Sequence, residues 1–221
     1  MKTNNVIVVD CETTGLSWEE HEVCQLAAMA FDGGTMGPIR QGGTFESLLR
    51  PLKPETIQDQ ALKVNGLSRE LLENAVHPRV VWGSFVRWVQ AFNLKGNGIL
   101  TAPILAGKNV RNFDIHFLNR LGALYSPKKE KEVLFNRREQ IDLEDLLRQW
   151  FWSNPTVEKM SMDYLRERFK MKTDRAHSAL GDVEQTGRMI QYFMQLTRDL
   201  QQMKTADGRK LIDFDAAFQG I

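Results

Sequence analysis

The sequence predicts a single α/β domain in which a mixed β-sheet is covered by helices. Near the amino terminus, three short apolar runs follow one another with links too short for helical crossovers, as in an antiparallel meander. After residue 80 the apolar residues recur at helical spacing, and these stretches alternate with short strand-like runs. A chain of 221 residues, 42% of them hydrophobic, is long enough to bury one core of this kind.

The three amino-terminal strands are bounded by turn residues and carboxylates. Residues 5–10 form a β-branched run that ends on Asp10, as a buried strand does. Residues 23–32 form the second run, and two glycines follow it as a turn signal. Residues 43–50 form the third run, which Pro51 ends.

The remaining elements alternate between helix and strand. Asp142 and Ser161 stand where they would cap the helices that follow them. In order, we predict a helix over 83–93, a strand over 103–106, a helix over 113–124, a strand around 141, and helices over 143–152, 161–169 and 179–203. We place the domain over residues 1–205 and treat 206–221 as a carboxyl-terminal tail.

Composition limits the class of protein. Lysine and arginine number 29 against 28 acidic residues, which argues against a protein that coats long duplexes and leaves room for a site gripping a few phosphates. Two cysteines, Cys11 and Cys24, are too few for a disulfide framework, so a reducing cytoplasm is the expected compartment. No apolar run approaches the roughly 20 residues of a membrane helix, so we expect no membrane association.

The first candidate site segment is Val9-Asp10-Cys11-Glu12-Thr13-Thr14-Gly15. Side chains two residues apart in a strand point the same way, so Asp10 and Glu12 present two carboxylates together. Such a pair repels itself unless a cation neutralises it, and Mg²⁺ and Mn²⁺ prefer oxygen ligands. A polar strand end followed by a turn is the alternative, and it would account for most isolated pairs of this kind.

Two further segments contain candidate residues. Asp114 opens the helix after the strand over 103–106, where a carboxylate also complements the helix dipole. His177 precedes the long helix, and Asp182 lies in its first turns. A histidine can take a proton near neutral pH and a carboxylate can bind a metal, although a surface histidine and an ordinary helical aspartate are the alternatives.

The order of the three segments closely resembles the DEDDh exonucleases. That family includes epsilon-type polymerase proofreading subunits, ribonuclease T, oligoribonucleases and animal 3′ repair exonucleases. The resemblance covers roughly residues 5–195 and includes the segment from Phe45 to Leu67, which ends in Val64-Asn65-Gly66-Leu67.

This resemblance implies a ribonuclease-H-like fold with a five-stranded mixed sheet, and hydrolysis of phosphodiesters with two Mg²⁺ or Mn²⁺ ions. Asp10, Glu12 and Asp182 would bind the first ion, and Asp10 would also bridge to the second. Asp114 would act on the second ion, and His177 would deprotonate the attacking water. Substrate contacts would come from Thr13, Thr14, Gly15, Leu16, Asn65 and Asn109.

Some positions depart from the family pattern or have a competing interpretation. Val110 stands where many members have asparagine, with Asn109 one position earlier as in oligoribonuclease-like members, and Gln25 replaces a common glutamate. Leu16 would wedge against the terminal base, or else cover the core as a turn residue. The basic residues around Arg137 and Arg138 could touch phosphates, but glutamates among them favour a solvated loop.

We therefore predict a 3′→5′ exonuclease on single-stranded nucleic-acid ends, with DNA slightly preferred over RNA. An RNA-trimming exoribonuclease or an oligoribonuclease is the alternative within the class, because contacts to the 2′-OH cannot be derived from sequence. A catalytically silent nucleic-acid-binding module is the alternative outside it. A proofreading role would require a polymerase, or another nucleic-acid-processing protein, acting in trans.

Overall fold

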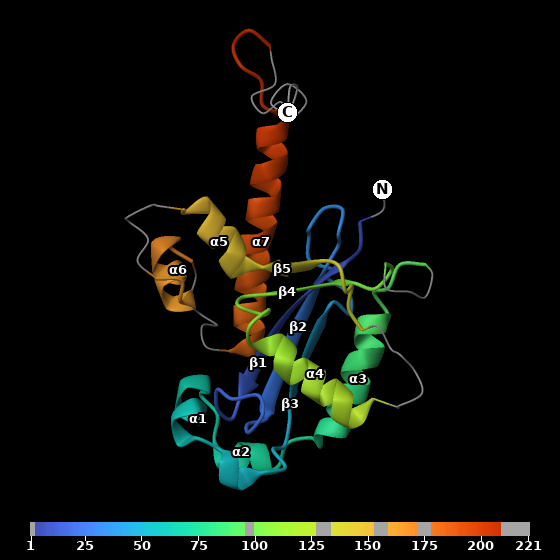
Figure 1. Cartoon of the computed structure of the whole chain (residues 1–221), viewed down its shortest axis with the longest axis vertical. Coiled ribbons are helices and arrows are strands. Elements are labelled where there is room, and N and C mark those ends of the chain that lie inside the picture. Colours follow the sequence, from blue (N-terminus) through green and yellow to red (C-terminus); the bar gives the residue numbers. More distant parts are fainter. Residues whose placement is uncertain (1–2, 96–99, 127–133, 153–158, 172–177, 209–221) are drawn as a thin grey trace.

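Five strands form one mixed sheet, as the sequence predicts. The computed structural model describes residues 3–95, 100–126, 134–152, 159–171 and 178–208. The strand order is β3-β2-β1-β4-β5. β1, β2 and β3 pair antiparallel as the predicted meander, and β4 and β5 are parallel to β1 (Figure 1). The strands are β1 (Val6–Thr13), β2 (Val23–Phe31), β3 (Thr44–Leu48), β4 (Ile104–Gly107) and β5 (Gln140–Asp142).

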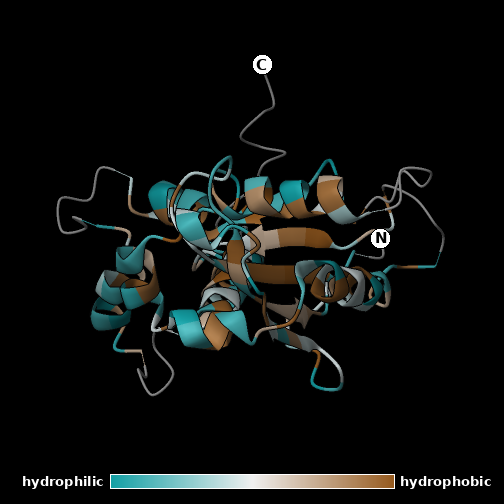
Figure 2. Ribbon diagram, turned by 90° about the horizontal axis from the view of Figure 1, so that it is seen from below, coloured by the Kyte–Doolittle hydropathy of each residue, from teal (hydrophilic) through white to brown (hydrophobic). Residues whose placement is uncertain are grey.

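Helices pack on both faces of this sheet, and alternate residues of β1 belong to different hydrophobic cores. Ile7 and Val9 face α3 and α4, whereas Val6 and Val8 face α5, α6 and the long α7. Figure 2 shows the apolar strands between helices that are only partly apolar. The helices are η1 (Pro54–Thr56), α1 (Asp59–Asn65), α2 (Arg69–Glu73), α3 (Pro78–Gln90), α4 (Asp114–Tyr125), α5 (Leu143–Trp150), α6 (Met162–Arg168) and α7 (Ala179–Gln202).

The structure corrects two of the predicted boundaries and adds two helices. β1 continues to Thr13 because its last residues still pair with β2, so Asp10 lies inside the strand and not at its end. α3 begins at Pro78 and not at residue 83, because His77 caps its first turn. The short helices α1 and α2 were not predicted: each has one buried residue, Leu62 and Leu72 respectively, and so shows no apolar periodicity.

α7 packs closely against β2 because a glycine faces the strand. A Cβ atom added at Gly187 would lie 2.1 Å from Cζ of Phe31, whose ring is buried. The missing side chain therefore sets how close α7 approaches the sheet, and it helps to place the amino terminus of α7 beside the end of β1.

We predict that Gly187→Ala lowers the free energy of unfolding by about 1–3 kcal/mol, because the extra methyl overpacks the core by more than the helix propensity of alanine offsets. Gly83→Ala in α3 is the matched control, since its Cβ would meet only the flexible end of Arg87 at 3.6 Å. That variant should gain up to about 1 kcal/mol. Urea unfolding measures both, and an equal change in the two variants would contradict the packing argument.

Candidate active site

Three of the predicted carboxylates meet on the face of the sheet that α7 covers. Asp10 and Glu12 alternate with Val6 and Val8 along β1, so all four side chains point toward the same face. α7 begins at Ala179 and brings Asp182 to this face in its first turn. The Ser178 hydroxyl caps the helix by accepting a hydrogen bond from the Gly181 N–H at 3.2 Å. A strand register and a helix cap therefore position the three carboxylates.

Asp114 reaches the same region from the other side of the sheet. It is the first residue of α4 and is almost completely buried. Its Oδ1 accepts a hydrogen bond from the backbone N–H of Cys11 at 2.8 Å. Because Cys11 lies between Asp10 and Glu12, this bond fixes the start of α4 to the acidic part of β1.

The charges of the other three carboxylates act on Asp10. Burial raises the pKa of Asp10 well above its usual value, and the charges of Asp114, Glu12 and Asp182 raise it further. Lys108 lowers it. Burial is also the main cause that raises the pKa of Asp114 to about 7. The site thus concentrates negative charge where water cannot screen it, and a nearby cation would relieve that repulsion.

Arg166 already places a positive charge beside one of these carboxylates. Arg166 of α6 is only 4% exposed, and its guanidinium forms an ion pair with Asp182. The same group donates to Asp163 Oδ1 at 2.7 Å and to Gln185 Oε1 at 2.8 Å. No sequence pattern indicated Arg166, because α6 has no motif and its packing against α7 is a tertiary contact.

The donor set suits a divalent metal ion, since four carboxylates supply the hard oxygen ligands that Mg²⁺ and Mn²⁺ prefer. Within the described ranges, however, no group of three or more acidic, imidazole or thiol side chains is placed so that it could hold a metal ion as it stands. Two of the carboxylates have other partners: Asp182 is paired with Arg166, and Asp114 is bonded to Cys11 N. The side chains are thus of the type that binds a divalent ion, and Asp182 would bind that ion while it also pairs with Arg166.

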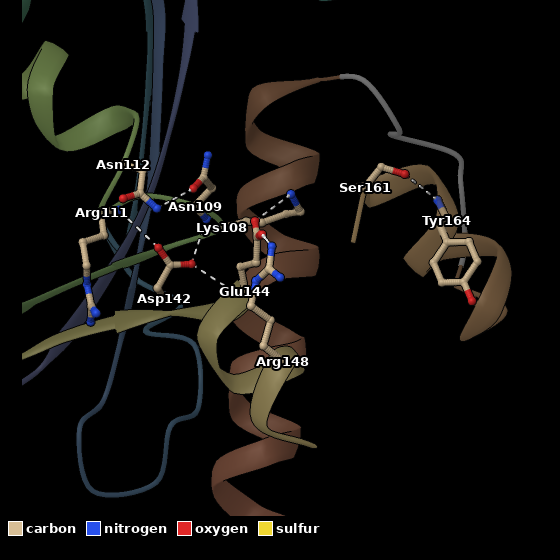
Figure 3. A network of polar contacts seen from close by, with 9 residues as sticks. All are labelled: Lys108, Asn109, Arg111, Asn112, Asp142, Glu144, Arg148, Ser161 and Tyr164. Atoms are coloured by element: carbon tan, nitrogen blue, oxygen red, sulfur yellow. Dashed lines mark hydrogen bonds and ion pairs between the residues drawn. The ribbon is translucent and has the colours of Figure 1, made fainter. Parts of the chain in front are cut away.

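The loop after β4 is shaped by Asp142 rather than by a substrate-binding side chain (Figure 3). Asp142 Oδ1 accepts from the N–H groups of Asn109 at 2.8 Å and Glu144 at 3.0 Å, so the residue caps α5 as predicted and also fixes this loop. Asn109 has a positive φ of 56° and its Oδ1 accepts from Asn112. A substrate contact from Asn109 remains a prediction, and its observed role is to form the turn.

The turn after β1 holds the other predicted substrate residues. The Thr13 hydroxyl donates to Gly15 O at 2.8 Å, and Thr14 Oγ1 accepts from Glu22 N at 3.0 Å. Asn65 of α1 donates to Thr13 O at 3.0 Å. Leu16 is 81% exposed, which contradicts the alternative that it covers the core.

A second set of contacts, which the sequence did not indicate, fixes this turn. A Cβ atom on Gly15 would lie 2.2 Å from Cδ2 of His21, so glycine is needed where the buried imidazole packs. Arg120 donates to the carbonyls of Trp18 and His21. Trp18 is 42% exposed and stacks on His116 at 5.6 Å, which leaves an aromatic surface near Leu16. No sequence motif links Trp18 to the site.

His177, the predicted general base, lies outside the described residues, as do Lys128, Lys129 and Lys131. Its assignment therefore stays a prediction. Ser178 and Asp182, which follow it, place the start of α7 beside the carboxylates.

The chain matches one protein family over most of its length. The family model of RNase_T, described as an exonuclease, matches residues 7–189. The chain belongs to the RNase_T exonuclease family. The match includes every carboxylate of the candidate site.

Relatives of this chain include polymerase components. The chain is 26% identical over 207 residues to a DNA polymerase III PolC-type protein of Thermotoga maritima, covering 94% of this chain and 13% of that protein. It is 26% identical over 186 residues to DNA polymerase III subunit epsilon of Aquifex aeolicus, covering 83% of this chain and 77% of that protein. The chain thus spans about an eighth of the length of the PolC-type relative.

Solved structures share the fold. E. coli exonuclease I in complex with a dT13 oligonucleotide superposes with a TM-score of 0.68 at 17% identity, over 89% of this chain and 43% of that chain. The cell-death related nuclease CRN-4 superposes with a TM-score of 0.67 at 17% identity, over 88% of this chain and 65% of that chain. These similarities confirm the predicted ribonuclease-H-like sheet. Among the described helices of the chain, none has both the length and the apolar character needed to cross a bilayer.

We predict that Asp114→Asn makes the stability of the metal-free protein less sensitive to pH. A carboxyl group with a raised pKa binds its proton more tightly in the folded state, so wild-type stability falls as pH rises from about 4 to about 7. Asparagine keeps the acceptor for Cys11 N–H but does not titrate. In EDTA, the stability of the variant relative to wild type should therefore increase with pH up to about 7 and then level off.

Urea unfolding at several pH values in EDTA measures this difference. Glu70→Gln is the control, because Glu70 is exposed on α2, away from the carboxylate cluster. A difference for Asp114→Asn that does not change with pH would show that the buried carboxylates are not the source of the pH dependence.

Proposed function

We propose that this chain is a metal-dependent 3′→5′ exonuclease of the histidine type, acting on single-stranded ends. The observation that carries the proposal is the convergence of Asp10, Glu12, Asp114 and Asp182, within an exonuclease-family chain, at a place buried enough to raise the pKa of two of them. Such a charge concentration is costly in a protein that only binds nucleic acid, since nucleic acid is itself negative. This is the argument against a silent binding module.

The four carboxylates would hold two divalent ions such as Mg²⁺ or Mn²⁺. When bound, the ions would stabilise the attacking and the leaving oxygen of a phosphodiester hydrolysis. Asp10 and Glu12 are fixed by β1, and the Cys11 bond fixes Asp114, so these three carboxylates need little reorganisation. His177 would accept the proton of the attacking water, since an imidazole titrates close to neutral pH.

The turn after β1 supports a requirement for a free 3′ end. Leu16 and Trp18 present exposed apolar surface beside the carboxylates, and both suit contact with an unpaired terminal base. The hydroxyls of Thr13 and Thr14 are engaged in holding this turn. We therefore assign base contact to Leu16 and Trp18, and we assign the threonines to shaping the turn.

The relatives favour DNA as the substrate, because those matched are named as components of DNA polymerase III. RNA trimming or oligoribonucleotide degradation is the alternative, since discrimination depends on a 2′-OH contact. A polymerase acting in trans is a candidate partner, by analogy with the Aquifex subunit. Two buried free thiols, Cys11 and Cys24, agree with a reducing, cytoplasmic compartment.

We predict that Asp10→Asn abolishes most hydrolysis while leaving the fold intact. An amide binds Mg²⁺ poorly, and the neutral group removes repulsion from a buried carboxylate cluster. Asp182→Asn is the less clean variant, because it also removes an ion-pair partner of the buried Arg166. The assay follows the degradation of a 5′-labelled linear single strand and of a circular single strand with Mg²⁺. The thermal unfolding midpoints of the wild-type and variant proteins show whether each variant is folded.

Linear DNA should be shortened one nucleotide at a time, and circular DNA should survive under the same conditions. Rapid cutting of the circle would overturn the exonuclease assignment. Near-normal turnover by folded Asp10→Asn would show that the metal site is misassigned. An RNA strand of the same sequence, run in parallel, decides between the two substrate classes.

We predict that His177→Ala slows hydrolysis by about 10²- to 10⁴-fold, the range for losing a general base. Binding of an oligonucleotide, measured in Ca²⁺ by fluorescence anisotropy, should change little, because other groups hold the phosphate. A parallel loss of binding and turnover would instead make His177 a substrate-binding or structural residue.

A further inference from the structure

A cavity lies at the end of the sheet away from the carboxylates. It has a volume of about 720 Å³ and is bordered by the starts of β1, β4 and β5, the turn after β2, and the carboxyl-terminal half of α7. Arg198 of α7 lines it, 16 residues after Asp182, which corresponds to about 24 Å along the helix. In Figure 1 this is the upper end of the sheet, and the carboxylates lie at the lower end. The cavity is therefore separate from the candidate active site.

Arginines concentrate positive charge on this cavity. Arg137, Arg138 and Arg198 line it, and within the described part of the chain none of their side chains has an acidic partner. Arg111 also lines it but is paired with Asp145 at 2.9 Å. Glu139 also lines the cavity, so three arginines without an acidic partner stand there against one carboxylate, and the local charge is positive.

The interior of the cavity is apolar. Val6, Met36 and Ile104 line it, and each is less than 10% exposed. Met194 of α7 and Ile141 of β5 also line it. A flat apolar group with an attached anion matches this combination, because the ring would lie against the aliphatic and thioether side chains while the anion meets the arginines. The volume lies in the range of small-molecule pockets.

We propose that this cavity binds a nucleotide unit, with its phosphate on Arg137, Arg138 and Arg198 and its base against the apolar interior. Guanidinium groups bind phosphate through paired, charge-assisted hydrogen bonds. The unit is either a free nucleotide or part of a strand whose 3′ end lies at the carboxylates. A distance of about 24 Å corresponds to about seven nucleotides at 3.4 Å each. Only the strand source rests on the proposed nuclease function.

The test measures binding in EDTA, where no hydrolysis is required. The probes are inorganic phosphate, dTMP, dT4 and dT12, and the variants are Arg137→Gln/Arg138→Gln and Arg198→Gln. Arg87→Gln is the matched control, because Arg87 is exposed on α3 and, among the described residues, its side chain donates only to Ser84 Oγ. Thermal unfolding of each variant without ligand shows that it is folded.

If the occupant is a free nucleotide, the cavity variants should weaken dTMP binding by about 10- to 100-fold, the loss expected for charge-assisted hydrogen bonds. If the occupant belongs to a strand, dTMP binding changes little, and the affinity advantage of dT12 over dT4 falls by a similar factor. Arg87→Gln should match wild type in both arms. If the cavity variants weaken only the binding of inorganic phosphate, the three arginines form a phosphate site and the base contributes no recognition.

The proposal is overturned if the cavity variants are folded and match Arg87→Gln for every probe. If the wild-type protein does not hydrolyse linear DNA with Mg²⁺ but binds dTMP at the cavity, the nuclease assignment is refuted and the cavity site still stands. The two failures are therefore distinguishable.

Discussion

Repulsion among four carboxylates, of which Asp114 is buried and the other three are half-buried, is the constraint on which the rest of the site depends. Burial and mutual charge raise the pKa of Asp10 and of Asp114, so the site is strained whenever it lacks a nearby cation. Two contacts partly offset this repulsion. The Cys11 N–H donates to Asp114, and Arg166 supplies a buried positive charge to Asp182. The same repulsion makes the site a suitable place for divalent ions, because a bound cation is worth most where water screens least.

Arg166 links this electrostatic problem to the packing of α6 and α7. Its guanidinium connects Asp163 of its own helix to Asp182 and Gln185 of α7, so the ion pair also joins two helices. A buried pair of this kind adds little net stability but is costly to break from one side. The amino terminus of α7 is therefore fixed by three independent features: the Ser178 cap, the close approach at Gly187 and the Arg166 pair.

The near-neutral net charge of the chain hides a separation of acidic and basic residues along the sheet. Carboxylates gather in the second half of β1, at the first residue of α4 and in the first turn of α7, whereas arginines gather about 24 Å away around the cavity at the other end of the sheet. A near-neutral total of 29 basic and 28 acidic residues suggested only a short phosphate-binding site. Arg137 and Arg138 are exposed, which agrees with the expected solvated loop, and they also border a cavity because the folded chain brings α7 and Arg198 beside them.

The sequence by itself determined the meander, the mixed sheet and the four carboxylates, because periodicity and order along the chain are local properties. Its prediction that Asp142 caps α5 is also confirmed, since a helix cap depends on neighbouring residues. Only the tertiary structure decided that Leu16 is exposed, that Asn109 forms a turn, and that Trp18 and Arg166 belong near the site. It also decided where the arginines meet. These features depend on contacts between residues up to about a hundred positions apart, such as Arg120 with Trp18, and no local pattern encodes them.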